Sequence, residues 1–318
     1  MKALIIGASG FVGPYLLAEL ARDKTIELHA TKLPAEPPFT PAAQDGSSVQ
    51  SYDLDVRDGN AVHALIREIN PDHVYHLAAL SSIKQSWDRP ELTVDINLKG
   101  ALHLLEALRA TPKKPRVLLV GTGEEYGFSA RAHESISEDA PLAPGNVYAV
   151  TKAAQNLLGA VYAKAYRIPA VMARSFNHIG PGQDPAFAVS DFSRQIAQME
   201  KGLCPPVIRV GNLSAKRDFC DVRDIVRAYV RLLHAGEPGE TYNIGSGQAV
   251  SIQEILNKLL ALAHCPVTIQ TEPQRFRPVD IPHIQADTRK LSALFDWKPR
   301  YTLDDTLLDM LHYWRQAL

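Results

Sequence analysis

The chain begins with a short apolar segment, a glycine-rich turn and a helical pattern, in that order. Residues 2–6 suit a buried strand, and residues 15–21 carry apolar side chains at helical spacing. Glycines in the turn let a backbone approach a pyrophosphate, and a helix N-terminus supplies N–H groups and a positive dipole. A plain tight turn is the alternative, but this context favours a dinucleotide-binding loop. The predicted contacts of the loop are Gly7, Gly10, Phe11, Val12 and Gly13.

Strand-like and helical segments alternate through the first half of the chain. Apolar runs of strand length occur at 26–30, 73–79, 116–120 and 170–174, with helical patterns between them, as at 61–69 and 98–109. This alternation predicts an α/β fold, a Rossmann-type doubly wound parallel sheet with a smaller C-terminal α/β substrate-binding domain. We expect residues 1–175 to form mainly the cofactor domain and residues 176–318 mainly the substrate domain. Around residues 212–245 the chain is expected to cross back to the cofactor domain.

Composition excludes several other classes of protein. A net charge of -1 over 318 residues, without a basic cluster, argues against nucleic acid as a main partner. No apolar stretch reaches membrane-spanning length, and the start lacks a signal-peptide pattern. The three cysteines, Cys204, Cys220 and Cys265, are widely spaced, which predicts reduced thiols of a cytoplasmic protein and no metal site.

Tyr148 and Lys152 are four residues apart in a helical pattern, so their side chains should share one helix face. A nearby ammonium favours the phenolate and is expected to lower the tyrosine pKa. Such a tyrosine can exchange a proton with a substrate oxygen. The alternative is a surface tyrosine beside a solvated lysine, because this spacing is common by chance.

Ligands of a doubly wound sheet collect at the carboxyl ends of its strands, here after Ala79, Val120 and Arg174. Thr122 follows the second of these ends and can hydrogen-bond an oxygen beside Tyr148. Glu124 lies at the same end as a candidate catalytic carboxylate, with a solvated acid as the alternative.

The end of the second strand bears on the cofactor. An NAD enzyme usually has an acid there for the ribose 2′-hydroxyl. Thr31 and Lys32 occupy that end, whereas Glu27 is at the opposite end of the strand. A hydroxyl and a cation suit a 2′-phosphate, so we expect NADP(H) to be preferred, with NAD(H) possible.

Arginines spread over several C-terminal loops suit a diphosphate, because guanidinium binds phosphate oxygens through paired N–H groups. The candidates are Arg209, Arg217 and Arg277, and Asp280 beside the last suits a ribose diol. Surface pairing with neighbouring acids is the alternative, and it is favoured for Arg223 and Arg227.

The glycine loop, Thr122, Tyr148 and Lys152 resemble the extended short-chain dehydrogenase/reductase family over essentially the whole chain. The resemblance implies that Tyr148 is the acid/base, that Lys152 holds the cofactor ribose, and that Thr122 orients the substrate. It further implies an adenine contact at Asp55 and Val56 and cofactor packing at a strand end, with Asn97 and Lys99 on the next helix. That strand end is Leu77, Ala78 and Ala79. His76 is expected to be a core histidine.

The C-terminal motifs resemble the nucleotide-sugar epimerase/dehydratase branch of this family, and particularly bacterial GDP-6-deoxy-D-mannose reductases. Such enzymes reduce the 4-keto group of GDP-4-dehydro-6-deoxy-D-mannose to GDP-D-rhamnose. The implied contacts with the GDP-linked sugar are Ser81, Glu124, Asn177, Arg209, Asn212, Arg217, Arg277 and Asp280.

Three alternatives remain open at this point. A GDP-mannose 4,6-dehydratase would use Glu124 as a base, although Gly123 and the stretch 178–183 depart from that pattern. A 4-epimerase would hold NAD tightly, and a non-catalytic protein would bind the cofactor only. Relatives pair the helices near 98–109 and 148–166 across a dimer, so we expect a homodimer.

Overall fold

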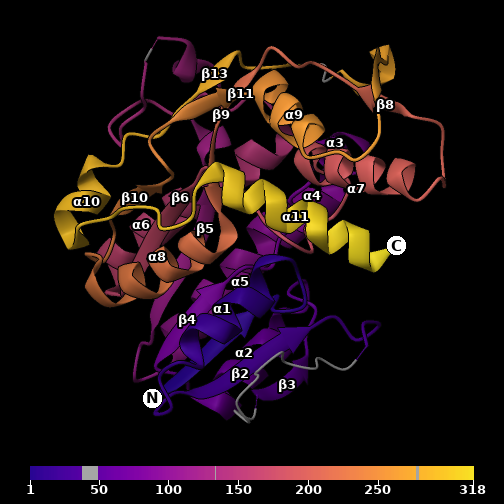
Figure 1. Ribbon diagram of the computed structural model, residues 1–318. Helices are drawn as coiled ribbons and strands as arrows, with labels where there is room; N and C mark the ends of the chain where they lie inside the picture. Colours follow the sequence, from indigo (N-terminus) through magenta and orange to yellow (C-terminus); the bar gives the residue numbers. More distant parts are fainter. Residues whose placement is uncertain (38–48, 133, 277–278) are drawn as a thin grey trace.

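The computed structural model of this protein describes residues 1–37, 49–132, 134–276 and 279–318 (Figure 1). In these residues seven strands form the main sheet, in the order β10-β6-β5-β4-β1-β2-β3. Every neighbouring pair in it is parallel, which confirms the predicted doubly wound fold. The strands are β1 (Lys2–Ile6), β2 (Glu27–Lys32), β3 (Val49–Asp53), β4 (His73–His76), β5 (Arg116–Thr122), β6 (Ala170–Ser175) and β10 (Thr241–Ile244).

Helices cover both faces of this sheet. Apolar residues of α1 (Val12–Leu20), α8 (Val222–Ala235) and α10 (Arg289–Phe295) form one core layer. Residues of α2 (Gly59–Ile69), α5 (Gly100–Ala110) and α6 (Val147–Tyr166) form the other. The strands between them are apolar on both sides, as expected for a buried parallel sheet.

Three local features differ from the sequence prediction. Strand β3 was not predicted, because three of its five side chains are exposed and polar and give no apolar run. The run at 73–79 ends as a strand at His76. The helix expected at 98–109 begins with a π-helical turn, η1 (Asp95–Lys99), which is a feature often found at functional sites.

The second half of the chain builds a smaller unit beside the carboxyl ends of the main strands (Figure 1). Its strands form two small sheets, and α7, α9 and α11 share a separate hydrophobic core. The first sheet holds β7 (Asn177–Ile179), β9 (Lys216–Asp221), β11 (Ala249–Ser251) and β13 (His283–Ile284). The second holds β8 (Val207–Val210) and β12 (Thr268–Thr271). The helices are α7 (Ala188–Glu200), α9 (Ile252–Ala261) and α11 (Leu303–Ala317).

The chain crosses between the two units more than once. After β9 it returns to the main sheet through α8 and β10, and then leaves again at β11. Short helices complete the described chain: α3 (Ile83–Asp88), α4 (Pro90–Val94), η2 (Gly123–Glu125), η3 (Gly127–Ala132) and η4 (Pro273–Arg275).

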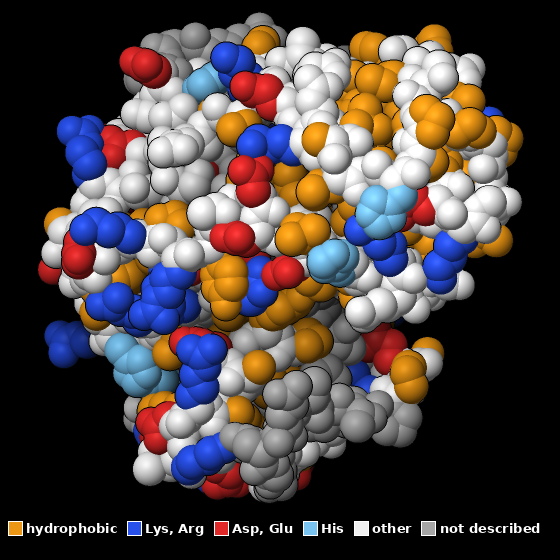
Figure 2. Space-filling model, viewed as in Figure 1, with side chains coloured by type: hydrophobic (Ala, Val, Ile, Leu, Met, Phe, Trp, Pro, Cys, Tyr) orange, Lys and Arg blue, Asp and Glu red, His pale blue; other side chains and the backbone are white. Residues whose placement is uncertain are grey.

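Figure 2 shows Lys and Arg side chains interspersed with Asp and Glu over the viewed face, while hydrophobic side chains gather at its upper right. This mixture agrees with the near-zero net charge of the chain. Across the described ranges, no helix has the length and apolar character needed to cross a membrane.

Candidate active site

The glycine loop is shaped by close backbone approaches. Gly7 has φ +84°, and a Cβ there would lie 2.7 Å from the backbone of Ala78. A Cβ on Gly13 would lie 2.0 Å from the carbonyl oxygen of Ala8. At Gly10 a Cβ would make only an ordinary van der Waals contact, 3.6 Å from the Gly7 carbonyl oxygen, so a side chain there would meet no clash. Gly7 and Gly13 are therefore required by the fold, whereas Gly10 leaves room beside the N-terminus of α1.

The loop also touches the second unit of the chain. The ring of Phe11 is stacked on His178, with centroids 6.2 Å apart. The Tyr15 hydroxyl donates to the carbonyl oxygen of Pro181 at 2.7 Å. These contacts place the segment after β6 directly over the start of α1.

Tyr148 is the second residue of α6, whose start is fixed on two sides. Asn146 caps the helix by accepting from the Ala149 N–H at 2.9 Å. Buried Asn97, in the π-helical turn, donates to the Thr151 hydroxyl at 3.0 Å, and this hydroxyl donates to the carbonyl oxygen of Tyr148. The π-helical turn thus helps to set the position of Tyr148.

Tyr148 has a different electrostatic environment from the predicted one. Burial raises its pKa above the usual value, and a hydrogen bond with the Thr122 side chain opposes that rise. The expected lowering of the tyrosine pKa by Lys152 is wrong for this structure. The Lys152 ammonium instead donates to the carbonyl oxygen of Val120 at 2.7 Å and to Gln155 Oε1 at 3.1 Å. Burial lowers the pKa of Lys152 itself to about 8.

Thr122 ends β5 and caps the short helix η2. Its hydroxyl accepts from the Glu124 N–H, and its own N–H donates to Glu125 Oε1 at 2.8 Å. Gly123 follows, where a Cβ would lie 3.0 Å from the Phe176 ring. This contact gives a physical reason for glycine at that position.

Four of the predicted substrate residues come together beside this turn. Arg217 donates to Asp280 Oδ1 at 2.8 Å, and Asn212 donates to Asp280 Oδ2 at 2.6 Å. The Arg217 Nε is 4.0 Å from Glu124 Oε1, and Asn146 donates to Glu124 Oε2 at 3.5 Å. This acidic cluster, comprising Glu124, Asn212, Arg217 and Asp280, contains residues from η2 and from the smaller unit. Arg217 is only 5% exposed, so its main role in this structure is to orient the two carboxylates and not to present a solvent-exposed positive charge.

The other predicted substrate residues are not in this cluster. Arg209 is exposed and pairs with Glu272 at 3.1 Å. Ser81 is exposed in the segment between β4 and α3, Asn177 is exposed at the start of β7, and Arg277 lies outside the described residues. Arg223 and Arg227 pair with Asp221 and Asp224, as the alternative of pairing with neighbouring acids predicts, although both carboxylates are buried.

The residues expected at the adenosine end of the cofactor are already partnered. The Thr31 hydroxyl is buried and accepts from the Gly7 N–H at 3.0 Å, so it supports the glycine loop. The Lys32 ammonium donates to Asp53 Oδ1 at 2.5 Å and to the carbonyl oxygens of Glu36 and Leu33. These three acceptors match the three donors of an ammonium.

The remaining predicted cofactor contacts follow β3 and β4. Asp55 forms a bidentate ion pair with Arg57, and Val56 is buried against α5. The N–H groups of Leu77 and Ala78 both donate to the Ile6 carbonyl at 2.9 Å. That pairing brings the segment after β4, which runs from Leu77 to Ala79, against the glycine loop. Lys99 pairs with Asp95 on the surface.

His76 is fully buried, as expected of a core histidine. Within the described chain neither of its ring nitrogens has a hydrogen-bond partner. Burial, aided by the charge of Lys152, lowers its pKa to about 3. The imidazole is therefore neutral at physiological pH.

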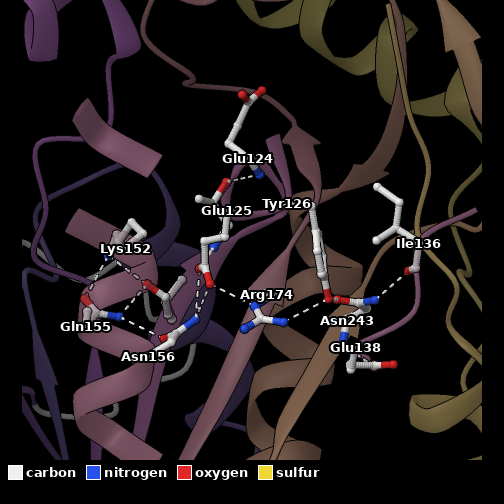
Figure 3. Close-up of polar contacts among 12 residues, drawn as sticks. Glu124, Glu125, Tyr126, Ile136, Glu138, Lys152, Gln155, Asn156, Arg174 and Asn243 are labelled. Atoms are coloured by element: carbon white, nitrogen blue, oxygen red, sulfur yellow. Dashed lines mark hydrogen bonds and ion pairs between the residues drawn. The ribbon is translucent and has the colours of Figure 1, made fainter. Parts of the chain in front are cut away.

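Sequence reasoning missed a buried polar network behind the turn. Glu125 accepts hydrogen bonds from Asn156 and Arg174 (Figure 3). Arg174 also donates to the Tyr126 hydroxyl, which in turn donates to Asn243 Oδ1. The apolar run predicts Arg174 only as a strand end, and its charge within that run is the signal that indicates a buried partner. Glu125 gave no distinct signal beside Glu124. The described residues hold no group of three or more His, Cys, Asp or Glu suited to a metal ion.

Comparison with known proteins agrees with this geometry. The sequence profile of the GDP-mannose 4,6-dehydratase family matches residues 4–310. The chain is 34% identical to the GDP-6-deoxy-D-mannose reductase of Pseudomonas aeruginosa, over 100% of this chain and 98% of that protein. It is 27% identical to the GDP-mannose 4,6-dehydratase of Vibrio cholerae, over 98% and 92% of the two chains.

Two solved structures share the fold over their full lengths. RMD from Pseudomonas aeruginosa in complex with NADPH aligns with a TM-score of 0.85 and 32% identity. The UDP-glucose 4-epimerase of Thermus thermophilus in complex with NAD aligns with a TM-score of 0.87 and 28% identity. Both alignments cover 100% of each chain. These similarities confirm the resemblance drawn from the motifs: the chain belongs to the GDP-mannose 4,6-dehydratase family.

Proposed function

We propose that this protein reduces the 4-keto group of GDP-4-dehydro-6-deoxy-D-mannose with NADPH and forms GDP-D-rhamnose. The observation that carries the proposal is the meeting of Thr122 and Tyr148 at the carboxyl edge of the sheet, beside the acidic cluster. The full-length similarity to a GDP-6-deoxy-D-mannose reductase supports the choice of substrate.

The loop geometry suits a dinucleotide. Gly7 and Gly13 hold the backbone close, and Gly10, where a Cβ would meet no clash, would let a pyrophosphate approach the N-terminus of α1. When bound, NADPH supplies the hydride. Lys152 would hold the nicotinamide ribose, and the end of β4 would pack against the cofactor. NADP(H) is the preferred cofactor in this proposal, and the neighbour in complex with NADPH supports it.

Tyr148 would donate its proton to the ketone oxygen as negative charge develops there. Its raised pKa keeps the phenol protonated, which is the state that a reduction requires. The Thr122 hydroxyl would donate to the same oxygen, and two donors aimed at one oxygen stabilise the transition state more than the ground state.

The acidic cluster would recognise the sugar nucleotide. Asp280, held by Arg217 and Asn212, presents its carboxylate to hydroxyl groups. The Arg217 Nε remains directed toward Glu124 and can meet a phosphate oxygen. Exposed Ser81, Asn177 and Arg209, together with Arg277, would complete the contacts with the nucleotide.

A second candidate is 4,6-dehydration of GDP-mannose. It is favoured by the position of Glu124, whose carboxylate lies between Asn146 and Arg217 and could remove a proton from sugar carbon 5. The family match also includes dehydratases.

The test is NADPH oxidation, followed by absorbance, with 4-keto-6-deoxy sugars linked to GDP, dTDP and UDP. We expect turnover with the GDP sugar, faster with NADPH than with NADH, and GDP-D-rhamnose as the product by NMR. Formation of a 4-keto sugar from GDP-mannose and NADP⁺ would favour the dehydratase. NADPH binding without substrate-dependent oxidation would contradict the reductase, and it would contradict the dehydratase as well only if GDP-mannose and NADP⁺ also gave no 4-keto sugar. Tightly bound NAD⁺ in the purified protein would favour an epimerase.

A homodimer formed through α6 is part of the proposal. Val150, Leu157 and Val161 lie on one face of this helix and are 51%, 58% and 56% exposed. Three aliphatic side chains on one exposed helix face are typical of an interface. Leu157→Arg should halve the mass measured by light scattering. A cytoplasmic location, for which the free thiols of Cys204, Cys220 and Cys265 are suited, completes the proposal.

A further inference from the structure

Glu125 is a carboxylate with no exposed surface, placed next to the proposed catalytic turn. Its Oε1 accepts from the Thr122 N–H at 2.8 Å. Its two oxygens accept from Asn156 Nδ2 at 2.9 and 3.0 Å, and Oε2 accepts from Arg174 Nε at 2.8 Å (Figure 3). Burial raises the pKa of Glu125, but each of these partners is a donor and opposes that rise. The ionised carboxylate is therefore satisfied, whereas a protonated one would have no acceptor among these donors.

A short chain of side chains connects Glu125 with Lys152. Gln155 Nε2 donates to Asn156 Oδ1 at 3.4 Å and to the Val120 carbonyl at 3.0 Å. Gln155 Oε1 accepts from the Lys152 ammonium at 3.1 Å. Gln155 and Asn156 are themselves almost completely buried. The buried Glu125 carboxylate is therefore bonded directly to Thr122 and linked through two side chains to Lys152.

We propose that Glu125 is the positioning residue of this active site: it holds the Thr122 backbone directly and the Lys152 ammonium through Asn156 and Gln155. The inference rests on the proposed reduction and adds a residue that never touches the substrate. Thr122 must place its hydroxyl within hydrogen-bond reach of the ketone oxygen, and small displacements of such donors cost rate more than binding.

A purely structural role is the competing explanation. Buried ion pairs such as Glu125–Arg174 can often be replaced by apolar residues without loss of stability, whereas removal of one partner leaves an unpaired charge. Loss of activity in a single variant could thus reflect instability, and a double variant that also removes the unpaired charge separates the two effects.

Glu125 also contributes charge to the site. Glu125 acts electrostatically on Arg174 on β6 and on Lys152 and Tyr148 on α6, while Glu124 and Tyr126 are its neighbours along the turn. One step further out, His76 on β4 faces Lys152, and Tyr229 on α8 acts on Tyr148. The negative charge of Glu125 raises the pKa of Lys152 and of Tyr148. Removing it should allow both groups to lose their protons at lower pH, so the alkaline limb of the rate profile should move toward lower pH.

The test compares Glu125→Gln with wild type in NADPH oxidation with the GDP-linked 4-keto sugar. We expect kcat to fall at least tenfold, KM for sugar and NADPH to stay within twofold, and the alkaline limb of kcat to shift to lower pH. Glu125→Asp, which keeps the charge, should keep the limb near its wild-type position. Glu138→Gln is the matched control, because Glu138 accepts from the Asn243 N–H at the far end of the same network.

The double variant Glu125→Gln with Arg174→Met removes the unpaired cation. We expect it to recover thermal stability relative to Glu125→Gln while kcat stays low. A kcat that recovers together with stability, or an unchanged kcat and pH profile in Glu125→Gln, would overturn the positioning role. Absence of turnover in the wild-type protein would instead overturn the proposed function, so the two failures are distinguishable.

Discussion

The ammonium of Lys152 lies 2.7 Å from the carbonyl oxygen of Val120, two residues before Thr122 on the same strand. This bond joins α6 to the end of β5 and directs the positive charge toward the backbone. Thr122, not Lys152, provides the interaction that lowers the Tyr148 pKa against the effect of burial. The site is thus arranged to keep the phenol protonated before a ketone accepts its proton.

Tyr148→Phe should abolish proton donation while leaving the shape of the site unchanged. Because positioned acid catalysis contributes roughly 10²–10⁴-fold, we expect kcat to fall by about that factor with KM for the GDP sugar nearly constant. Steady-state NADPH oxidation measures both constants. Tyr166→Phe, at the exposed end of the same helix, is the control and should behave as wild type. Normal turnover by Tyr148→Phe would remove the tyrosine from the mechanism.

The two glycines at the start of α1 should respond differently to alanine. Gly13→Ala places a Cβ 2.0 Å from the Ala8 carbonyl oxygen and should lower Tm without ligand. Gly10→Ala meets nothing closer than 3.6 Å, so Tm should be unchanged while the Kd for NADPH rises about tenfold or more, since the methyl group enters the space proposed for the pyrophosphate. Thermal unfolding and NADPH fluorescence titration check the pair. Equal effects on Tm would show that the contacts of the loop are misassigned.

Asp53 should limit the preference for NADPH. Its carboxylate accepts from the Lys32 ammonium at 2.5 Å and competes with a 2′-phosphate for that cation. Asp53→Asn should raise the ratio of kcat/KM for NADPH over NADH roughly threefold, the scale of an exposed ion pair. Asp72→Asn is a matched control, because Asp72 pairs with Lys113 at 2.5 Å before the start of β4, away from the carboxyl edge. An unchanged ratio in Asp53→Asn would exclude Lys32 from phosphate binding.

Asp280→Asn should weaken substrate recognition without affecting the cofactor. The amide keeps one acceptor oxygen, so it cannot serve both Arg217 and Asn212 as the carboxylate does. We expect KM for the GDP sugar to rise about tenfold, the scale of one charged hydrogen bond, with KM for NADPH unchanged. Asp304→Asn, which alters an exposed pair with Lys258, is the control. A parallel rise in both KM values would indicate a general structural effect.

His76 should make the fold sensitive to acid. Its pKa is about 3 in the folded protein, against 6.5 for an unperturbed histidine, so the unfolded chain binds a proton that the folded chain excludes. The contribution of His76 to the free energy of unfolding is fully present above about pH 6.5 and declines as the pH falls below that value. At pH 5 this residue lowers the free energy of unfolding by about 2 kcal/mol. His76→Leu should reduce the loss of stability between pH 7.5 and 5, measured by urea unfolding. Exposed His63→Gln should leave the loss unchanged; an equally large loss in His76→Leu would locate the acid sensitivity elsewhere.

Much of the architecture follows from local sequence pattern. The apolar runs of β1, β5 and β6 are strong enough to place these strands, because buried parallel strands are apolar on both faces. The polar edge strand β3 lacks that signal, and only its pairing with β2 makes it a strand. The π-helical turn around Asn97 likewise depends on contacts with residues 80 and 151, far away in sequence.

The sequence alone determined the glycine loop, the Tyr148–Lys152 spacing and the family, because each is carried by short motifs whose residues are close together along the chain. The tertiary structure decided the partners: Lys152 is bound to Val120, Lys32 to Asp53, and Arg217 to Asp280. It also brought Glu125 and Arg174, 49 positions apart, into one buried pair. Charges choose partners by distance in space and by exclusion of water, and neither quantity exists until the sheet and the smaller unit have packed together.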